Sequence, residues 1–327
     1  MSGIEDKKPI LSICIPTWNR AKFLDISLKS FVEQIVDIDT SELELYVSDN
    51  CSDDNTPDIV KLYIEQGLPI IYNRNEENLG AAGNFVKCMQ WASGKYILLL
   101  GDDDILETGS VKYILNQLRG NDYGLVHIHQ YKKLKEERIV YDNLEDFYKQ
   151  ISFWFTFMSG SIFRKDVVNM IDSSKYVKTH LLQMPYYLKS ATLGNTNLLL
   201  NKSLMKEGLD SSNNGGYNFY EVFVKNYLNI WQELVDENLL SKVGYEYIKR
   251  DIYVNFIIRF NYNLLICRRN IMSESKEYIG NRKGLKIAGA KDILKQYYGG
   301  YCYSVLSFLK YPQYVLSDLI RIIKKII

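Results

Sequence analysis

Short apolar runs alternate with longer amphipathic segments over the first hundred residues. Apolar side chains crowd into residues 11–15, 43–47, 70–72 and 96–100, whereas between these runs they recur every three or four positions. Short apolar runs are typical of buried strands, and the wider spacing is typical of helices with one buried face. The pattern therefore predicts the order β-α-β-α-β-α-β.

This order predicts an α/β protein with a mostly parallel central sheet and helices on both faces. Sheets of this kind bind ligands at the carboxyl ends of their strands. The polar residues that directly follow three of the strands are therefore the first candidates for a site. They are Thr17, Asn19 and Arg20 after the first strand, Asp49, Asn50, Ser52 and Asp54 after the second, and Asp102, Asp103 and Asp104 after the fourth.

Three consecutive carboxylates follow the most apolar strand. Their mutual repulsion is unfavourable, and a divalent cation would relieve it. Mg²⁺ and Mn²⁺ prefer oxygen ligands and share their other positions with phosphates and water. Along an extended segment Asp102 and Asp104 would point the same way, and Asp103 would point elsewhere, toward a sugar hydroxyl. A solvated acidic turn before a helix is the alternative interpretation.

Asp49 ends the second strand, where an ionised carboxylate could accept a hydrogen bond from a nucleobase N–H. A turn closed by the Asp49 side chain is the alternative, because the following residues are rich in turn formers. Asn78 and Gly80 precede the third helix, where backbone N–H groups could approach a phosphate or a sugar. The chain contains neither GxGxxG nor GxxxxGK[ST]. Nothing in the sequence therefore supports a Rossmann dinucleotide-binding site or a P-loop nucleotide-binding site.

These segments together resemble family 2 glycosyltransferases of the GT-A fold. The resemblance is carried by ICIPTWNR at 13–20, VSDNCSDDNT at 47–56, NLG at 78–80 and GKYILLLGDDD at 94–104, and it is weaker from about residue 110 to 210. Residues 157–164 look like the later family segment that lines the acceptor side of the sheet. The whole combination most resembles bacterial surface-polysaccharide transferases, including the abequosyltransferase-like group.

The resemblance implies roles for individual residues and a Mn²⁺ or Mg²⁺ cofactor. It implies that the loop after the first strand lies beside a nucleotide-sugar, that Asp49 holds the base, and that Ser52 and Asp54 shape the base-binding loop. Asp104, with Asp102, would bind a metal that bridges the diphosphate, and Asp102 and Asp103 would contact the donor. The implied donor-binding residues are Pro16, Thr17, Asn19, Arg20, Asp49, Ser52, Asn78, Gly80, Asp102 and Asp103.

Inverting members of the family carry an acidic base well after the metal motif, often in a Glu-Asp pair. Residues 153–201 contain no such pair, and His180 is the polar residue best placed by order. A neutral imidazole can act as a base near pH 7, although a helix-capping or packing role is the alternative for His180. Asp166 and Asp172 are weaker candidates. His127 and His129 alternate within a predicted strand.

The second half of the chain predicts a helical appendage. Helical spacing of aromatic and aliphatic residues begins near residue 218, so we expect a catalytic domain over 1–215 and a helical, basic region over 216–327. Residues 241–327 contain 16 basic and 6 acidic residues, against 24 and 33 in the rest of the chain. Residues 313–327 form an amphipathic pattern that predicts a helix lying on an anionic membrane surface, or one docked on protein.

Five cysteines without a CxxC pair favour a reducing cytosol. The first ten residues do not resemble a secretory signal, and no run of about 18 apolar residues predicts a membrane span. We therefore expect a cytoplasmic protein, and we consider a peripheral position on the inner face of the cell membrane.

The predicted function is metal-dependent, inverting sugar transfer from a nucleotide-sugar to a surface glycan, an O-antigen or a capsule, on an acceptor that we expect to be lipid-linked. A non-catalytic nucleotide-sugar-binding or scaffold protein on the same fold is the alternative. A nucleotidyltransferase would need a Gly-rich loop with a basic residue after the first strand, and PTWN at 16–19 supplies none. Nucleic-acid binding is not expected, because the aromatic residues follow helical faces rather than forming exposed stacking platforms. The pattern leaves the oligomeric state open.

Overall fold

The computed structural model describes residues 8–36, 38–206, 217–260 and 290–299, together with residues 309, 312 and 316. The chain divides into two compact units, the first made of Met1–Phe147 and Trp154–Leu209 and the second of Tyr148–Phe153 and Asp210–Ile327. Each unit is described by itself below. The predicted domain boundary at 215/216 lies outside the described residues.

The first unit is built on an eight-stranded sheet in the order β3-β2-β1-β4-β8-β6-β9-β7. Six of these strands run parallel, while β8 and β7 run antiparallel to their neighbours. This confirms the predicted mostly parallel α/β fold. The strands of this sheet are β1 (Leu11–Thr17), β2 (Leu43–Asp49), β3 (Ile70–Arg74), β4 (Tyr96–Leu99), β6 (Tyr123–Ile128), β7 (Arg138–Tyr141), β8 (Ser161–Arg164) and β9 (Thr196–Leu200), and β5 (Ile105–Leu106) pairs with β10 (Met205–Lys206) in a separate ribbon.

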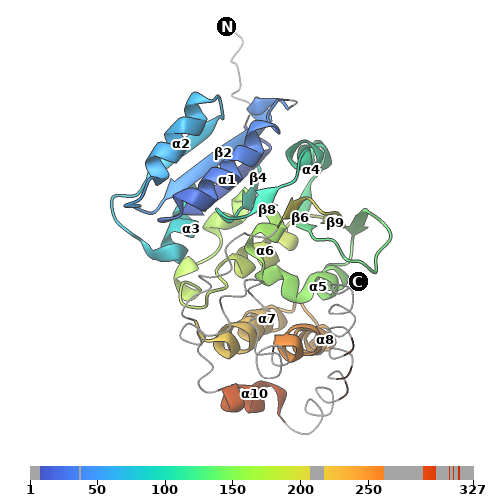
Figure 1. The fold of residues 1–327 in the computed structure, drawn as a ribbon. Helices are drawn as coiled ribbons and strands as arrows, with labels where there is room; N and C mark the ends of the chain where they lie inside the picture. Colours follow the sequence, from blue (N-terminus) through green and yellow to red (C-terminus); the bar gives the residue numbers. More distant parts are fainter. Residues whose placement is uncertain are drawn as a thin grey trace. The chain divides into compact units, whose positions relative to one another are not determined.

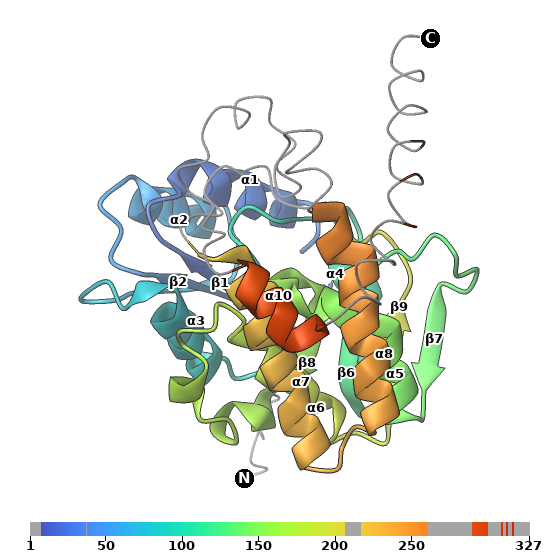
Figure 2. The same ribbon diagram turned by 90° about the horizontal axis from the view of Figure 1, so that it is seen from below.

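Helices cover both faces of the sheet, as the sequence predicts. Figures 1 and 2 show α1 (Ala21–Val32) and α2 (Thr56–Glu65) on one face and α3 (Gly80–Trp91) on the other. The helix α3 begins at Gly80 itself, whereas the sequence analysis placed this glycine before the helix. The remaining helical segments of this unit are α4 (Ser110–Leu118), α6 (Gln183–Ala191), the first part of α5 (Leu144–Ile151) and short 3₁₀ turns that include η3 (Met158–Gly160).

Alternation along the central strands decides which face packs against which helices. Every second residue of β1, β2 and β4 joins one buried cluster with the apolar stripes of α1, α2 and α4. Successive side chains of a strand point to opposite faces, so the intervening residues meet α3. The first cluster includes Leu11, Ile13, Ile15, Leu43, Leu45, Val47, Leu98, Leu24, Leu28, Phe31, Val60 and Ile114.

The strands β1 and β4 separate before the end of β1. Their pairing stops at Cys14 and Leu99, whereas β1 stays paired with β2 as far as Thr17 and Asp49. The Leu100 N–H donates to the Cys14 carbonyl at 2.8 Å, so the Pro16 nitrogen lies on the side where β4 has already left. The missing N–H of Pro16 therefore costs no ladder hydrogen bond. The two strands separate where the strand order reverses, the place at which α/β sheets bind ligands.

The second unit is helical in its described part, as the sequence predicts. It contains α7 (Tyr227–Asp236), α8 (Lys242–Ile252), α10 (Ala290–Tyr298), and π-helical turns at Glu221–Asn226 and Tyr253–Ile257. Aromatic packing dominates its core, since Phe219 stacks on Phe260 with ring centroids 3.4 Å apart and Tyr148 meets Trp231 edge-on at 5.2 Å. In the described part of the chain, no helix is long and apolar enough to cross a membrane. The helix predicted over 313–327 lies outside the described residues, apart from Leu316.

Gly194 lies against the backbone of β6, and its replacement tests this close packing in the first unit. A Cβ at this position would lie 2.0 Å from the Gly124 nitrogen, so the loop before β9 packs directly on the backbone of β6. We expect Gly194→Ala to lower the free energy of unfolding by several kcal/mol, because backbone cannot yield as a flexible side chain can. Denaturant unfolding of Gly194→Ala and of Asn195→Ala, an exposed neighbour, measures the effect. Equal stability of the two variants would contradict this close packing.

Candidate functional site

The loops that leave β1 and β4 are joined by their side chains. The Thr17 hydroxyl donates to Asp102 Oδ2 at 2.7 Å. The Arg20 guanidinium lies 2.8 Å from Asp102 and 2.7 Å from Asp103. Four of the predicted site residues therefore meet where β1 and β4 separate. Arg20, one of the implied donor-binding residues, forms ion pairs with the acidic turn in this structure.

The acidic segment is a tight turn, and the predicted extended arrangement is wrong. The Asp104 N–H donates to the Gly101 carbonyl at 3.1 Å, which closes the turn. Because the backbone reverses here, Asp102 and Asp103 share Arg20 as a partner instead of pointing to opposite sides. The Asp104 carboxylate instead accepts a hydrogen bond from the Ser159 hydroxyl, and Asp104 is buried.

Burial of Asp102 changes its acidity. Removal from water raises the pKa of this carboxyl to about 6, and the nearby Arg20 and Thr17 offset only part of that effect. Asp102 is thus ionised at neutral pH but takes up a proton in mildly acidic solution.

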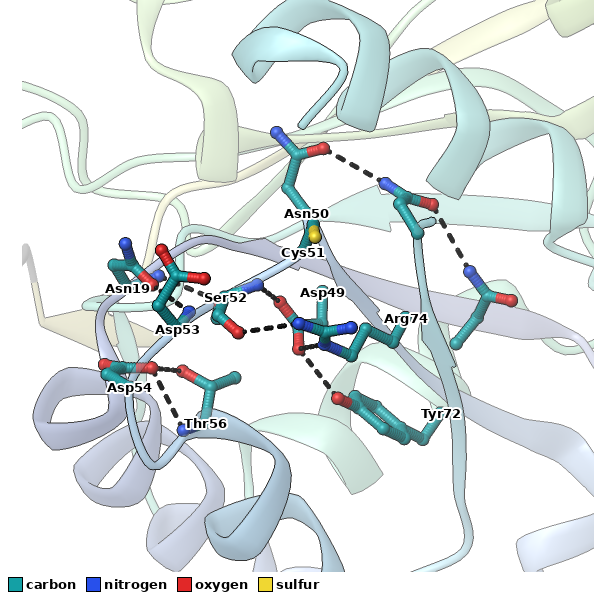
Figure 3. Close-up of polar contacts among 12 residues, drawn as sticks. Asn19, Asp49, Asn50, Cys51, Ser52, Asp53, Asp54, Thr56, Tyr72 and Arg74 are labelled. Carbon is teal, nitrogen blue, oxygen red and sulfur yellow. Dashed lines mark hydrogen bonds and ion pairs between the residues drawn. The ribbon is translucent and has the colours of Figure 1, made fainter. Parts of the chain in front are cut away.

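The loop after β2 is attached to the loop after β1 (Figure 3). The Asn19 N–H donates to the Ser52 hydroxyl at 2.9 Å, and Asn19 Oδ1 accepts from the Asp53 N–H at 2.7 Å. The Asp54 carboxylate accepts from the Ala21 N–H at 2.9 Å. Asn19 and Cys51 both have positive φ, 52° and 64°, a strained state for residues other than glycine. The contacts between the two loops hold this strain in place.

Asp49 lies fully buried at the centre of Figure 3. Its Oδ1 accepts from the Ser52 N–H at 2.9 Å, which is the turn-closing bond of the alternative interpretation. Its Oδ2 accepts from the Tyr72 hydroxyl at 2.7 Å and lies 3.7 Å from Arg74 Nε. Both oxygens are engaged, so a base that binds Asp49 must share these partners or displace one of them.

Tyr72 and Arg74 belong to the site although the sequence analysis did not select them. They lie at the carboxyl end of β3, a strand whose following residues it did not search. Arg74 also donates to the Ser52 carbonyl at 2.9 Å, so it joins both sides of the Asp49 loop. Trp18 is a further missed candidate, since its indole is 48% exposed between Thr17 and Asn19. An exposed indole beside these polar groups can stack on a planar ring.

A network of asparagine side chains holds the segment before α3. The Asn50 amide donates to Asn78 Oδ1 at 2.8 Å and to the Gly80 carbonyl at 3.3 Å. Asn75 donates to Asn50 and to Asn84, both at about 3 Å. Gly80 has a φ of 72°, which favours glycine at the start of α3. The predicted residues Asn78 and Gly80 are thereby tied to the end of β2.

A cavity of about 410 Å³ opens beside the end of β3, on the side of α3. It borders Arg74 and Asn75 but not the acidic turn. Thr17, Arg20 and the acidic turn do not line this cavity, whereas Arg74 does. The cavity is lined by Asn73, Arg74, Asn75, Glu76, Glu77, Leu79, Lys87 and Trp91.

Comparison with known proteins agrees with this geometry. Residues 12–173 match the sequence profile described as Glycosyl transferase family 2. The chain contains a family 2 glycosyltransferase domain. The abequosyltransferase RfbV of Salmonella typhimurium is 34% identical over 110 residues, which cover 33% of this chain and 32% of that protein. The chain thus matches about a third of the length of this curated relative.

Solved structures share the fold of this glycosyltransferase domain. Staphylococcus aureus TarS 1–349 in complex with UDP-GlcNAc has a TM-score of 0.59 at 18% identity, covering 78% of this chain and 76% of that one. The mannosyltransferase PcManGT from Pyrobaculum calidifontis, in complex with GDP-Man and Mn²⁺, has a TM-score of 0.52 at 15% identity, covering 70% and 65%. The predicted GT-A-like fold is confirmed.

The acidic turn of the glycosyltransferase domain fits a hard divalent cation that takes only one or two of its ligands from the protein. Among the described residues, no group of three or more His, Cys, Asp and Glu side chains could hold a metal. Asp102 and Asp104 supply two carboxylates from one turn. Mg²⁺ and Mn²⁺ are commonly held by one or two carboxylates with substrate phosphates and water. The chemistry of these donors therefore suits a cation that arrives with a diphosphate.

His180 lies in the exposed turn before α6 and has a φ of 58°. The first residue of α6, Gln183, donates to the Thr156 carbonyl at 2.7 Å, and Tyr187 donates to the Met158 carbonyl at 2.5 Å. Thus α6 starts beside the segment that leads to Ser159 and the acidic turn. The role of His180 as a base stays a prediction.

The other two histidines stay neutral. His127 lies in β6, as predicted, and its ring Nδ1 is 3.0 Å from the Ser161 hydroxyl. Burial lowers the pKa of His129 to about 4 and that of His127 well below its usual range. His129 packs against Trp154, with ring centroids 3.7 Å apart and an interplanar angle of 31°. These contacts suit a structural role.

The buried Asp102 predicts a pH dependence of stability in the metal-free protein. Because its folded pKa of about 6 lies above the unfolded value, the folded state binds more protons between pH 4 and 6. The contribution of Asp102 to the free energy of unfolding should therefore fall as pH rises through this window and level off above it. Unfolding of wild type and Asp102→Asn, followed from pH 4 to 7.5, measures the difference. A constant difference across the window would contradict the raised pKa.

Proposed function

We propose that the chain is a metal-dependent glycosyltransferase that moves a sugar from a nucleotide-sugar donor to a hydroxyl of a bacterial surface glycan, an O-antigen or a capsule. We further propose that the anomeric carbon is inverted. The observation that carries the proposal is the acidic turn where β1 and β4 separate, with Asp102 and Asp104 buried and with Thr17 and Arg20 bound to it. The family match supports the reaction class.

The donor is proposed to lie along the carboxyl ends of β1, β2 and β4. Asp49 and Arg74 offer an acceptor and a donor side by side, a pair that can recognise the edge of a nucleobase. Trp18 can stack on the base, and the backbone beside Pro16, Asn19, Asn78 and Gly80 can line the ribose and phosphates. UDP-GlcNAc in TarS and GDP-Man in PcManGT are donors of this chemical class.

Asp104 and Asp102 would hold the metal, Mn²⁺ or Mg²⁺. When bound, such a cation stabilises the negative charge that develops on the departing diphosphate. Arg20 lies between Asp102 and Asp103 and limits their mutual repulsion. Asp103 is partly exposed, and its carboxylate can accept a hydrogen bond from a hydroxyl of the donor sugar. His180 is proposed to take the proton from the acceptor hydroxyl as that oxygen attacks the anomeric carbon.

The acceptor is proposed to be lipid-linked, with the protein peripheral to the inner face of the cell membrane. The net charge of +10 over residues 241–327 supports contact with anionic lipid. A growing glycan that is attached to a membrane lipid and an enzyme that binds the same membrane surface would then be close together.

A thermal-shift panel of UDP-, GDP-, CDP- and dTDP-sugars, each with and without Mn²⁺, tests the donor site. A ligand that binds the folded state raises the melting temperature, so one nucleotide class should do so only with metal. Asp104→Ala should lose this metal-dependent shift and the Mn²⁺-dependent turnover of donor while remaining folded. Asp58→Ala, which removes an exposed carboxylate on α2, is the matched control. A wild-type response in Asp104→Ala would remove the metal assignment.

Replacement of His180 tests the base. We expect His180→Ala to lower turnover about 10²-fold or more while leaving donor affinity nearly unchanged, because a base acts on the acceptor. Initial-rate kinetics with the donor identified by the panel separate the two quantities. An unaltered rate would assign the base to another residue. Donor binding without any turnover in wild type would favour the non-catalytic alternative.

A further inference from the structure

The register of the sheet brings Ser159 to the acidic turn. β8 runs antiparallel to β4, and Leu98 pairs with Ile162. Continued beyond the paired residues, this register brings Gly101 opposite Ser159. The Gly101 N–H donates to the Ser159 hydroxyl at 2.9 Å, in agreement with that placement.

The same hydroxyl binds the last carboxylate of the turn. Ser159 donates to Asp104 Oδ2, and the Ser159 side chain is fully buried. A serine hydroxyl has one proton to donate and lone pairs to accept with. Since Gly101 occupies a lone pair, the proton is available for Asp104. One buried group therefore connects the first and last residues of the turn.

The turn leaves the Asp104 carboxylate little room. A Cβ on Gly101 would lie 2.9 Å from Asp104 Oδ2 and 3.1 Å from Asp103 Oδ1, so both carboxylates fold back over the glycine. Ser27 on α1 donates to the Asp104 carbonyl at 3.0 Å. The main chain of Asp104 is thus held from α1 and its side chain from η3.

We propose that Ser159 is a positioning residue for the metal-binding carboxylate of Asp104. The inference rests on the proposed function, because it takes Asp104 as a metal ligand. A ligand that is already oriented loses less freedom when it binds a cation, and loss of such an orienting group commonly lowers metal affinity about 10- to 100-fold. Ser159 also joins the acidic turn to the segment that leads into β8 through its hydrogen bonds to Gly101 and Asp104.

Direct Mn²⁺ binding to the full chain tests this role without any turnover. Free Mn²⁺ is counted by its electron paramagnetic resonance signal, with Mn²⁺ alone and with Mn²⁺ plus UDP. Ser159→Ala should bind Mn²⁺ about tenfold more weakly than wild type, or worse. Ser161→Ala is the matched control, because Ser161 is equally buried in the same segment but meets His127. Its Mn²⁺ affinity should equal that of wild type.

Conservative replacements of Ser159 distinguish loss of the hydroxyl that orients Asp104 from a general loosening of the segment around it. Ser159→Thr keeps the hydroxyl and should retain most of the Mn²⁺ affinity. Ser159→Cys keeps the size but has a weak donor, and it should bind Mn²⁺ more weakly than wild type. This last variant decides the question if Ser159→Ala does not fold.

The outcomes distinguish this inference from the proposed function. Wild-type Mn²⁺ affinity in Ser159→Ala, together with weak binding in Asp104→Ala, would overturn the role of Ser159 and leave the metal site intact. Equal affinity in Asp104→Ala and wild type would overturn both. An equal loss in Ser161→Ala and Ser159→Ala would also overturn the role of Ser159, because it would reflect loosening of the segment.

Discussion

The ion pair between Arg20 and the acidic turn is the constraint on which the site depends. β1 and β4 stop pairing at Cys14 and Leu99, so backbone hydrogen bonds no longer hold the loops that follow these two strands together. Arg20 and Thr17 then connect the loops through side chains. A carboxylate as buried as Asp102 is tolerated only when such partners compensate for lost water.

Polar networks extend this principle along the edge of the sheet. Asp49 is buried, and its two carboxylate oxygens accept hydrogen bonds from the Ser52 N–H and the Tyr72 hydroxyl. Asn50 and Asn75 bridge the ends of β2 and β3 to the start of α3. Satisfied buried networks of this kind fix one arrangement of their loops. The loops that follow β1, β2 and β3 are thereby joined to one another at this edge of the sheet.

Much of the fold followed from local pattern, and part of the site did not. The apolar runs located four parallel strands, because a strand buried on both faces is a short run of contiguous apolar residues. Asp49 and the acidic triplet were selected as candidates because they directly follow strands. Tyr72 and Arg74 were missed although they also end a strand, since their importance depends on contact with Asp49. The extended arrangement predicted for Asp102 and Asp104 was wrong because the backbone turns there.

The sequence by itself determined the order of strands and helices, the family resemblance and the edge at which the site lies. Periodicity and motif spacing belong to neighbouring residues, so these features need no knowledge of distant contacts. Only the tertiary structure decided that Arg20 pairs with Asp102 and that Ser159 binds Asp104. Those partners are brought together by strand order and register, and hydrogen bonds depend on distances that no single segment encodes.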